Sequence, residues 1–245
     1  MFYTCLPVSK IWPQSWPLEF RWIARWVPWV GLVVGGVLAL ADGILAAVHM
    51  PTLVRSAIVV AVAIGLTGGL HLDGVIDTAD GLALPQHARA RRLAAMADSR
   101  MGAFGGMAAI VLILLKVTAI AALISHRAFV LIAVSIWGRW GQQWAIARYP
   151  YLKKEGKGAF HKAALPSVRY TLPSLIAMVM LSLLVGNCGI VPWSVVWRTI
   201  LGGFSLSLLT SAYFYQQLGG HTGDTYGAVV EWTEALLLCS LTIGQ

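Results

Sequence analysis

Long runs of apolar residues are the feature that most constrains the fold of this chain. An α-helix needs about 20 mostly apolar residues to cross the hydrocarbon core of a bilayer. Seven segments meet this requirement: Trp29–Val48, Val54–Leu72, Phe104–Ile124, Phe129–Ala147, Leu172–Pro192, Val195–Tyr215 and Ala228–Ile243. No strand-like alternation competes with these runs. The sequence therefore predicts an all-α, polytopic integral membrane helical bundle of about seven transmembrane helices, with residues 1–245 forming a single membrane domain.

The small number of charged residues agrees with burial in a bilayer. Asp, Glu, Lys and Arg make up only 11% of the chain, whereas soluble domains carry about 25%. The formal net charge of +8 would suggest nucleic-acid binding in a soluble protein. Because the chain has no basic soluble domain, we expect no nucleic-acid partner. Cys5, Cys188 and Cys239 are too scattered for a disulfide framework or a zinc site.

Most of the basic residues are gathered in three segments, and these predict the topology. They are the arm before the first span (Lys10, Arg21, Arg25), the loop after the second (Arg89, Arg91, Arg92, Arg100) and the loop after the fourth (Arg148, Lys153, Lys154, Lys157, Lys162, Arg169). Cytoplasmic loops carry an excess of Lys and Arg. Seven spans with a cytoplasmic N-terminus place all three segments on that side. Residues 1–27, rich in Trp and Arg, are interpreted as a partly interfacial helix, with an ordinary cytoplasmic arm as the alternative.

A row of aspartates after the second predicted span carries the strongest chemical signal. Asp73, Asp77 and Asp80 are spaced i, i+4 and i+7, which would place three carboxylates on one face of a helix. Such charges repel each other and are costly near hydrocarbon. Mg²⁺ prefers a few carboxylates together with water and phosphate oxygens, so the spacing predicts a Mg²⁺ site formed by these three residues. The alternative is a solvated loop in which Asp73-Gly74 and Asp80-Gly81 form turns.

Charged residues further along the chain are candidate substrate ligands. A guanidinium beside a metal site can hold a phosphate through two hydrogen bonds, so Arg100 is a candidate catalytic group. Asp98 is a candidate substrate or metal ligand, or the partner of an arginine. Arg139 lies within a predicted span, so we expect it to face the bundle interior and to bind a substrate phosphate or a carboxylate, with snorkelling as the alternative. Lys116 is expected to pair with a membrane acid such as Asp42.

A glycine-rich block near the C-terminus, Gly219–Gly227, adds a second group of candidate substrate and metal ligands. Backbone N–H groups in such turns suit phosphate, which makes Gly223 a candidate substrate contact. Asp224 is expected to complete the metal site or to hold a ribose hydroxyl. Glu231 lies seven residues later, on the same face if a helix continues. His71 and His221 are each candidates for a proton acceptor or for a hydrogen-bonded structural residue.

Several stretches resemble one family, the bacterial cobalamin (5′-phosphate) synthases, also called adenosylcobinamide-GDP ribazoletransferases. They are Thr4–Val8, His71–Leu82, Met96–Phe104, Ala147–Tyr151 and Gly220–Ala228 together with Glu231 and Glu234. The matching stretches run in the same order over nearly the whole chain, while residues 83–90 and the loop after Arg148 look less typical.

The resemblance implies an enzyme of the bacterial inner membrane that uses Mg²⁺. It implies the last assembly step of the cobalamin nucleotide loop, in which adenosylcobinamide-GDP is joined to α-ribazole or its 5′-phosphate and GMP is released. We hypothesise that the three aspartates, alone or together with Asp224, hold Mg²⁺ on the diphosphate, that Arg100 and Arg139 steady the phosphates, and that the site faces the cytoplasm. The sequence leaves open whether the protein forms a homo-oligomer.

Two other classes of membrane protein are alternatives. Intramembrane charges also occur in ion-coupled transporters, but here the acids gather at one side and no internal repeat is visible. A CDP-alcohol-type phosphotransferase also uses aspartates on membrane helices. This chain lacks that family's DG-x-x-AR run, because Val75-Ile76-Asp77-Thr78 follows Asp73-Gly74.

Overall fold

The computed structural model describes residue 4, residues 20–153 and residues 157–243. Its helices are η1 (Phe20–Trp26), α2 (Val27–Ala47), α3 (Thr52–Thr67), α4 (Leu70–Leu82), α5 (Arg89–Ala95), α6 (Ala103–Ala122), α7 (Arg127–Arg148), α8 (Lys157–Ala164), η2 (Val168–Thr171), α9 (Leu172–Asn187), α10 (Trp193–Leu218) and α11 (Gly223–Thr242). Within the described residues there is no strand, so the predicted all-α class is confirmed. Most of the predicted interfacial helix lies outside the described residues.

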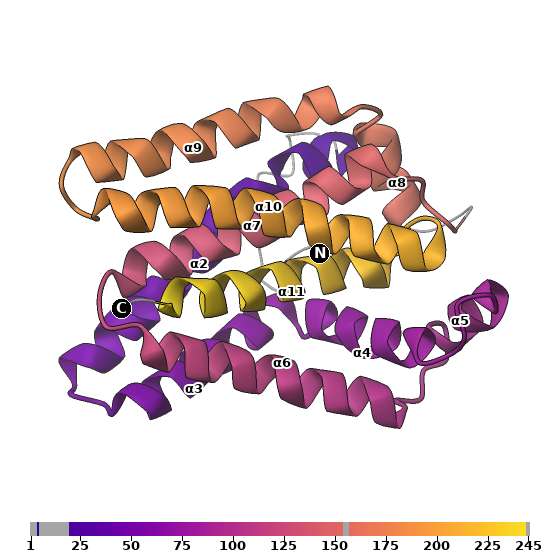
Figure 1. Ribbon diagram of the computed structural model, residues 1–245, viewed down its shortest axis with the longest axis horizontal. Helices are drawn as coiled ribbons and strands as arrows, with labels where there is room; N and C mark the ends of the chain where they lie inside the picture. Colours follow the sequence, from indigo (N-terminus) through magenta and orange to yellow (C-terminus); the bar gives the residue numbers. More distant parts are fainter. Residues whose placement is uncertain (1–3, 5–19, 154–156, 244–245) are drawn as a thin grey trace, which may run out of the picture.

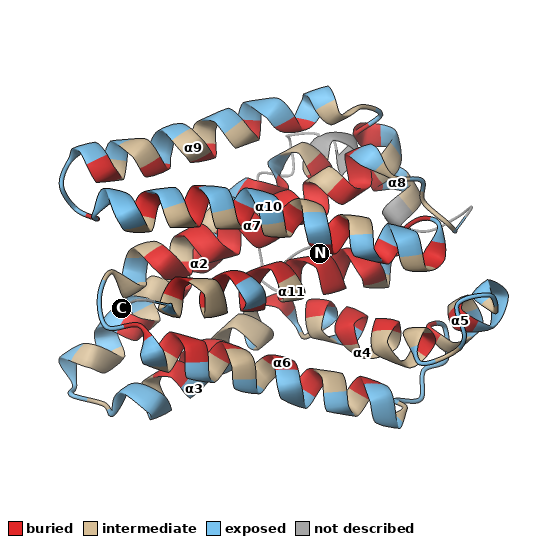
Figure 2. Cartoon of the chain, in the orientation of Figure 1, coloured by how far each residue is buried: buried red, intermediate tan, exposed pale blue. Residues whose placement is uncertain are grey.

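Helices α7 and α11 form the interior of the bundle. Helix α7 packs against α2, α10 and α11, and α11 also contacts α4 and α6. Figure 2 shows buried residues along most of α7 and α11, whereas the outer helix α9 is largely exposed or intermediate. The long helices run roughly along one axis, with α5 and α8 towards one end (Figure 1).

Glycines allow α2 and α7 to approach each other closely. A Cβ atom at Gly31 would lie 2.5 Å from the carbonyl oxygen of Ser135, and one at Gly35 would lie 2.6 Å from the Cα of Ile132. Gly31 and Gly35 are four residues apart, which is the small-xxx-small spacing that brings membrane helices into backbone contact. The two helices therefore form a closely packed pair, with α2 held against the interior helix α7.

Several helices are suited to crossing a bilayer, which makes this a multi-pass membrane protein. The described chain contains four helices that are long and apolar enough, spanning Ile23–Ala47, Ala103–Ala122, Val168–Asn187 and Trp193–Leu218, and a fifth span if α3 and α4 count as one broken span. Helices α7 and α11 do not meet this test, because they carry charged and amide side chains into the bundle interior. Seven spans and a cytoplasmic N-terminus stay predictions.

The second predicted span, Val54–Leu72, is wrong at its end. Helix α3 ends at Thr67, and Gly68 and Gly69 follow with φ angles of 62° and 73°. This left-handed backbone favours glycine and terminates helices. Helix α4 then begins at Leu70, bent by 90° from α3. The aspartate row therefore lies on a short helix of its own.

The predicted pairing of Lys116 with Asp42 is also wrong. Asp42 accepts hydrogen bonds from Arg127 Nε at 3.0 Å and Nη2 at 2.7 Å, and Arg55 Nε lies 3.0 Å from the same carboxylate. Asp42 is near the end of α2, where the first turns of α3 and α7 meet it. Lys116 faces α11 from the middle of α6, where it binds Glu231.

Candidate active site

Helix α4 presents its aspartates on the side facing away from its buried stripe. His71, Gly74, Val75 and Thr78 are among the buried residues, whereas Asp73 is exposed and Asp77 and Asp80 are partly buried. The predicted placement of the three aspartates along one face of a helix is confirmed, and the solvated-loop alternative is wrong.

A close contact between α4 and α11 brings Asp224 to this acidic face. A Cβ atom at Gly74 would collide with the backbone carbonyl of Asp224, and one at Gly227 would lie 3.0 Å from the Cα of His71. The first turn of α11 therefore rests directly on α4. Asp73, Asp224 and Asp80 are all close enough to repel the negative charge of Asp77. We call Asp73, Asp77 and Asp224 the carboxylate cluster.

Gly74→Ala is expected to separate these two helices and to lower activity about ten-fold or more. A methyl group at this position must push α11 away, and displacements of about 1 Å can cost a hundred-fold in rate. Gly65→Ala on α3 is the matched control, because a Cβ there meets nothing within 4 Å. Turnover and thermal unfolding of both variants in detergent would check this. Equal activity of the two variants would contradict the close contact.

Asp80 differs from the other aspartates because it caps α6. Its two carboxylate oxygens accept backbone N–H groups from Gly102 at 2.7 Å and from Gly105 at 2.8 Å. These donors belong to the first turn of α6, where N–H groups have no partner within the helix and anions are favoured. Asp80 therefore anchors the start of α6, and its predicted role as a metal ligand stays a prediction.

The donors of the carboxylate cluster suit Mg²⁺ in type. Among the described residues, no three His, Cys, Asp or Glu side chains are arranged to hold a metal by themselves. Mg²⁺ usually keeps several waters and takes only one or two carboxylates together with substrate phosphates. Partial burial and repulsion from the other aspartates both disfavour a charge on Asp77, and Lys153 offsets this only in part, so a dication would stabilise the charged cluster. The residues therefore fit a magnesium ion completed by water and substrate better than a closed protein chelate.

Asp98 and Arg100 pair with each other at the protein surface. Arg100 Nη2 donates to Asp98 Oδ2 at 2.7 Å, and Arg100 Nε donates to Oδ1 at 3.1 Å. Hydrogen bonds from Arg100 lower the pKa of Asp98 to about 2. The alternative of an arginine partner for Asp98 is therefore confirmed. The Arg100 side chain is 87% exposed, so it is accessible to a phosphate in water.

Arg139 and Glu231 lie apart from the surface, in a buried ion network. Lys116 Nζ lies 2.5 Å from Glu231 Oε2 and 2.6 Å from Glu234 Oε2, and Arg139 Nη1 donates to the other Glu234 oxygen. Two cations and two anions thus balance in the bundle interior. Arg139 faces the bundle interior and binds the Glu234 carboxylate, which confirms the prediction of an inward-facing arginine paired with a carboxylate. Substrate binding by Arg139 and Glu231 stays a prediction.

The two histidines have different surroundings. His221 uses both ring nitrogens: Nε2 donates to the Ser211 carbonyl at 3.2 Å, and Nδ1 lies 3.0 Å from the Thr225 hydroxyl. Burial lowers the pKa of His221 to about 4, and both of its ring nitrogens already have partners within the protein, which fits the structural alternative. His71 is also buried, but its Nδ1 has no hydrogen-bond partner in the described structure. It lies on the buried side of α4, away from the carboxylate cluster, so its role as a proton acceptor stays a prediction.

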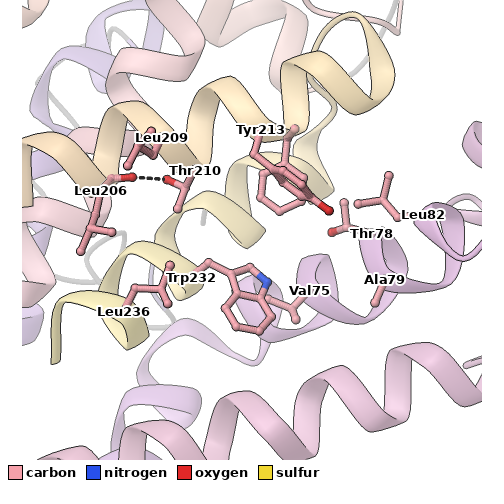
Figure 3. A pocket seen from close by; sticks show the side chains of 11 residues that line it. Val75, Thr78, Ala79, Leu82, Leu206, Leu209, Thr210, Tyr213, Trp232 and Leu236 are labelled. Atoms are coloured by element: carbon pink, nitrogen blue, oxygen red, sulfur yellow. Dashed lines mark hydrogen bonds between the residues drawn. The ribbon is translucent and has the colours of Figure 1, made fainter. Parts of the chain in front are cut away.

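An apolar groove of about 540 Å³ lies on the reverse side of α4 (Figure 3). It is lined from α4, α10 and α11 by Val75, Thr78, Ala79, Leu82, Leu206, Leu209, Thr210, Tyr213, Phe214, Trp232 and Leu236. None of the carboxylates lines this groove. The groove therefore does not offer a place for phosphate chemistry, which needs the opposite face of the helix.

Local sequence patterns gave no role to Lys153 and did not predict the partners of Glu234, because these partners are distant in the chain. Lys153 Nζ lies 3.5 Å from Asp224 Oδ2, and Glu234 joins Lys116 to Arg139. Arg92, one of the basic residues of the loop after the second predicted span, is buried and donates to the carbonyls of Leu84 at 2.8 Å and Gln217 at 3.0 Å. It therefore ties α5 to the ends of α4 and α10. The contacts of Lys153 and Glu234 leave no local signal in the sequence, although the EWTE stretch does place Glu234 one helical turn after Glu231.

Comparisons with known proteins agree along the whole chain. The cobalamin-5-phosphate synthase family model matches residues 1–242. A curated relative from Trichormus variabilis, named adenosylcobinamide-GDP ribazoletransferase, is 52% identical over 99% of this chain and 94% of its own. Relatives of the same name from Thermosynechococcus vestitus and a Synechococcus species are 50% and 47% identical over 100% of this chain and 94% of theirs. No solved structure matched this chain. The chain belongs to the cobalamin-5-phosphate synthase family.

Proposed function

We propose that this protein is an adenosylcobinamide-GDP ribazoletransferase. It joins adenosylcobinamide-GDP to α-ribazole or its 5′-phosphate and releases GMP, which completes the cobalamin nucleotide loop. The observation that carries this proposal is the name shared by relatives about half identical over nearly their full length. The carboxylate cluster supplies chemistry of the matching kind, because a diphosphate substrate needs its charge neutralised.

Asp73, Asp77 and Asp224 would hold Mg²⁺ together with substrate phosphate oxygens. When bound, the ion screens the charge of the diphosphate and improves GMP as a leaving group. The chain's own residues orient the reactants. Arg100 reaches phosphate from the loop that begins α6, close to Asp80, which fixes Gly102 in that loop. A ribazole hydroxyl then attacks the phosphorus attached to cobinamide, GMP leaves, and the hydroxyl proton passes to water.

The cellular setting is part of the same proposal. The excess of basic residues in the loops that adjoin the carboxylate cluster favours the cytoplasmic face of the bacterial inner membrane for the active site. Arg89, Arg91 and Arg100 are all exposed there. The bilayer and two small-molecule substrates are the expected partners, and a homo-oligomer stays open.

A defined reaction tests the function. Purified protein in detergent, given adenosylcobinamide-GDP and α-ribazole, is expected to release GMP and form the joined corrinoid only when Mg²⁺ is present. Chelation with EDTA should stop the reaction, and added Mg²⁺ should restore it. Chromatography of the nucleotide and corrinoid products measures both outcomes.

The same assay separates the alternatives. A CDP-alcohol-type phosphotransferase would release CMP from a CDP-linked donor and no GMP. A transporter would form no product in either reaction. Full turnover in EDTA would support the transferase activity but contradict its dependence on Mg²⁺.

A further inference from the structure

Among the described residues, Lys153 is a basic residue paired with the carboxylate cluster. Its Nζ lies 3.5 Å from Asp224 Oδ2, and its positive charge also acts on Asp77. The distance is at the outer limit for a hydrogen bond, and exposed ion pairs stabilise a protein little. The Lys153 side chain is 47% exposed. Its ammonium group is therefore held loosely beside Asp224 and is open to another anion.

The backbone before Lys153 is fixed to the turn that begins α11. Leu152 N donates to the carbonyl of His221 at 2.8 Å, and His221 N donates to the carbonyl of Pro150 at 2.9 Å. The Leu152 side chain fills the space that a Cβ at Gly220 would need. This short parallel bridge holds the base of Lys153 close to the first turn of α11. The flexible four-carbon stem then leaves its charge free to move.

Charge balance indicates what the ammonium group is for. A diphosphate that reaches the cluster adds negative charge to three carboxylates, and one dication offsets only part of the total. A compact cation next to Asp224 can neutralise more. Without substrate, the same ammonium offsets part of the carboxylate charge.

We propose that Lys153 is a phosphate-binding residue of the transferase reaction. Its ammonium leaves Asp224 and pairs with the diphosphate of the GDP-activated corrinoid when substrate and Mg²⁺ enter the cluster. This inference rests on the proposed function. It assigns Lys153 to the nucleotide-activated substrate and not to α-ribazole, and it assigns the residue no part in holding the metal.

Lys153→Met, Lys153→Arg and the control Arg169→Met test this role. Arg169 is also an exposed cation, but no ion pair joins it to the carboxylate cluster in the described structure. For Lys153→Met we expect the KM for adenosylcobinamide-GDP to rise about ten- to hundred-fold, as loss of one charge-assisted contact predicts. The KM for α-ribazole should stay the same. Lys153→Arg should recover most of the loss, and Arg169→Met should behave as wild type.

Binding of Mn²⁺ alone, followed by electron paramagnetic resonance, separates phosphate binding from damage to the site. Lys153→Met should bind Mn²⁺ at least as tightly as wild type, because a competing cation is gone. An unchanged KM for adenosylcobinamide-GDP, or loss of Mn²⁺ binding, would overturn the proposal. Wild-type protein that releases no GMP would instead remove the proposed function, before any variant is compared.

Discussion

Asp77→Asn is expected to lower GMP release about 10²–10³-fold, as loss of one group that stabilises transition-state charge does. Stability should stay at the wild-type level or rise. Partial burial, and after it repulsion from Asp73, Asp224 and Asp80, disfavours a charge on Asp77, so removal of that charge should stabilise the folded protein. Functional sites often sacrifice stability in this way. Turnover and thermal unfolding in the same detergent measure the two effects.

Asp42→Asn is the matched contrast for this substitution. It makes the same chemical change at a carboxylate that is paired with Arg127 and Arg55, so stability should fall. Opposite signs of the two changes in stability would identify Asp77 as a functional residue and Asp42 as a structural one. Near-normal turnover of Asp77→Asn would remove Asp77 from the mechanism. A fall in its stability comparable to that of Asp42→Asn would make it structural.

Glu234→Ala is expected to destabilise the protein by about 3–5 kcal/mol, the cost of breaking a buried ion pair. Glu234 binds both Lys116 and Arg139. Its loss leaves two cations and one anion inside the bundle, and uncompensated charge in a membrane interior is expensive. Unfolding in mixed SDS and detergent micelles measures the change in free energy.

A double-mutant cycle separates charge balance from loss of contacts. Lys116→Met and Glu231→Gln each leave one unmatched charge, whereas the double variant keeps the neutral pair of Arg139 and Glu234. We expect the double variant to be more stable than the sum of the single effects predicts, with a coupling of about 1–3 kcal/mol. Additive effects would show that charge balance does not govern this interior.

Local patterns in the sequence predicted the helical class and the aspartate row correctly. The i, i+4, i+7 spacing needs only regular helix geometry, so Asp73 and Asp77 could be placed on one face without knowledge of tertiary contacts. The end of the second span was predicted wrongly, because hydropathy continues through Leu72 while the backbone turns at Gly68. The hydropathy of a segment does not reveal that a glycine within it adopts the left-handed backbone conformation that ends the helix.

Pairings between distant segments were not predictable in the same way. Lys116 and Asp42 are both charged residues inside predicted spans, but helix rotation and depth decide that Lys116 meets Glu231 instead. Asp224 reaches the aspartate row only because Gly74 lets two helices touch. Asp80 and Gly102 meet across an intervening short helix. Each of these contacts depends on packing that no single helix determines.

The glycine contacts between α2 and α7 have a consequence for how a bulky substrate enters. Helices whose backbones already touch cannot rotate or slide past each other without collision, so α2 and α7 behave as one rigid unit. A structural change that admits a bulky substrate would therefore involve elements other than this pair. Helix α5 is the clearest such element, because it packs mainly on α4 and is held to the rest through the carbonyl contacts of Arg92. A change in the position of α5 would then leave the packing between α2 and α7 unaltered.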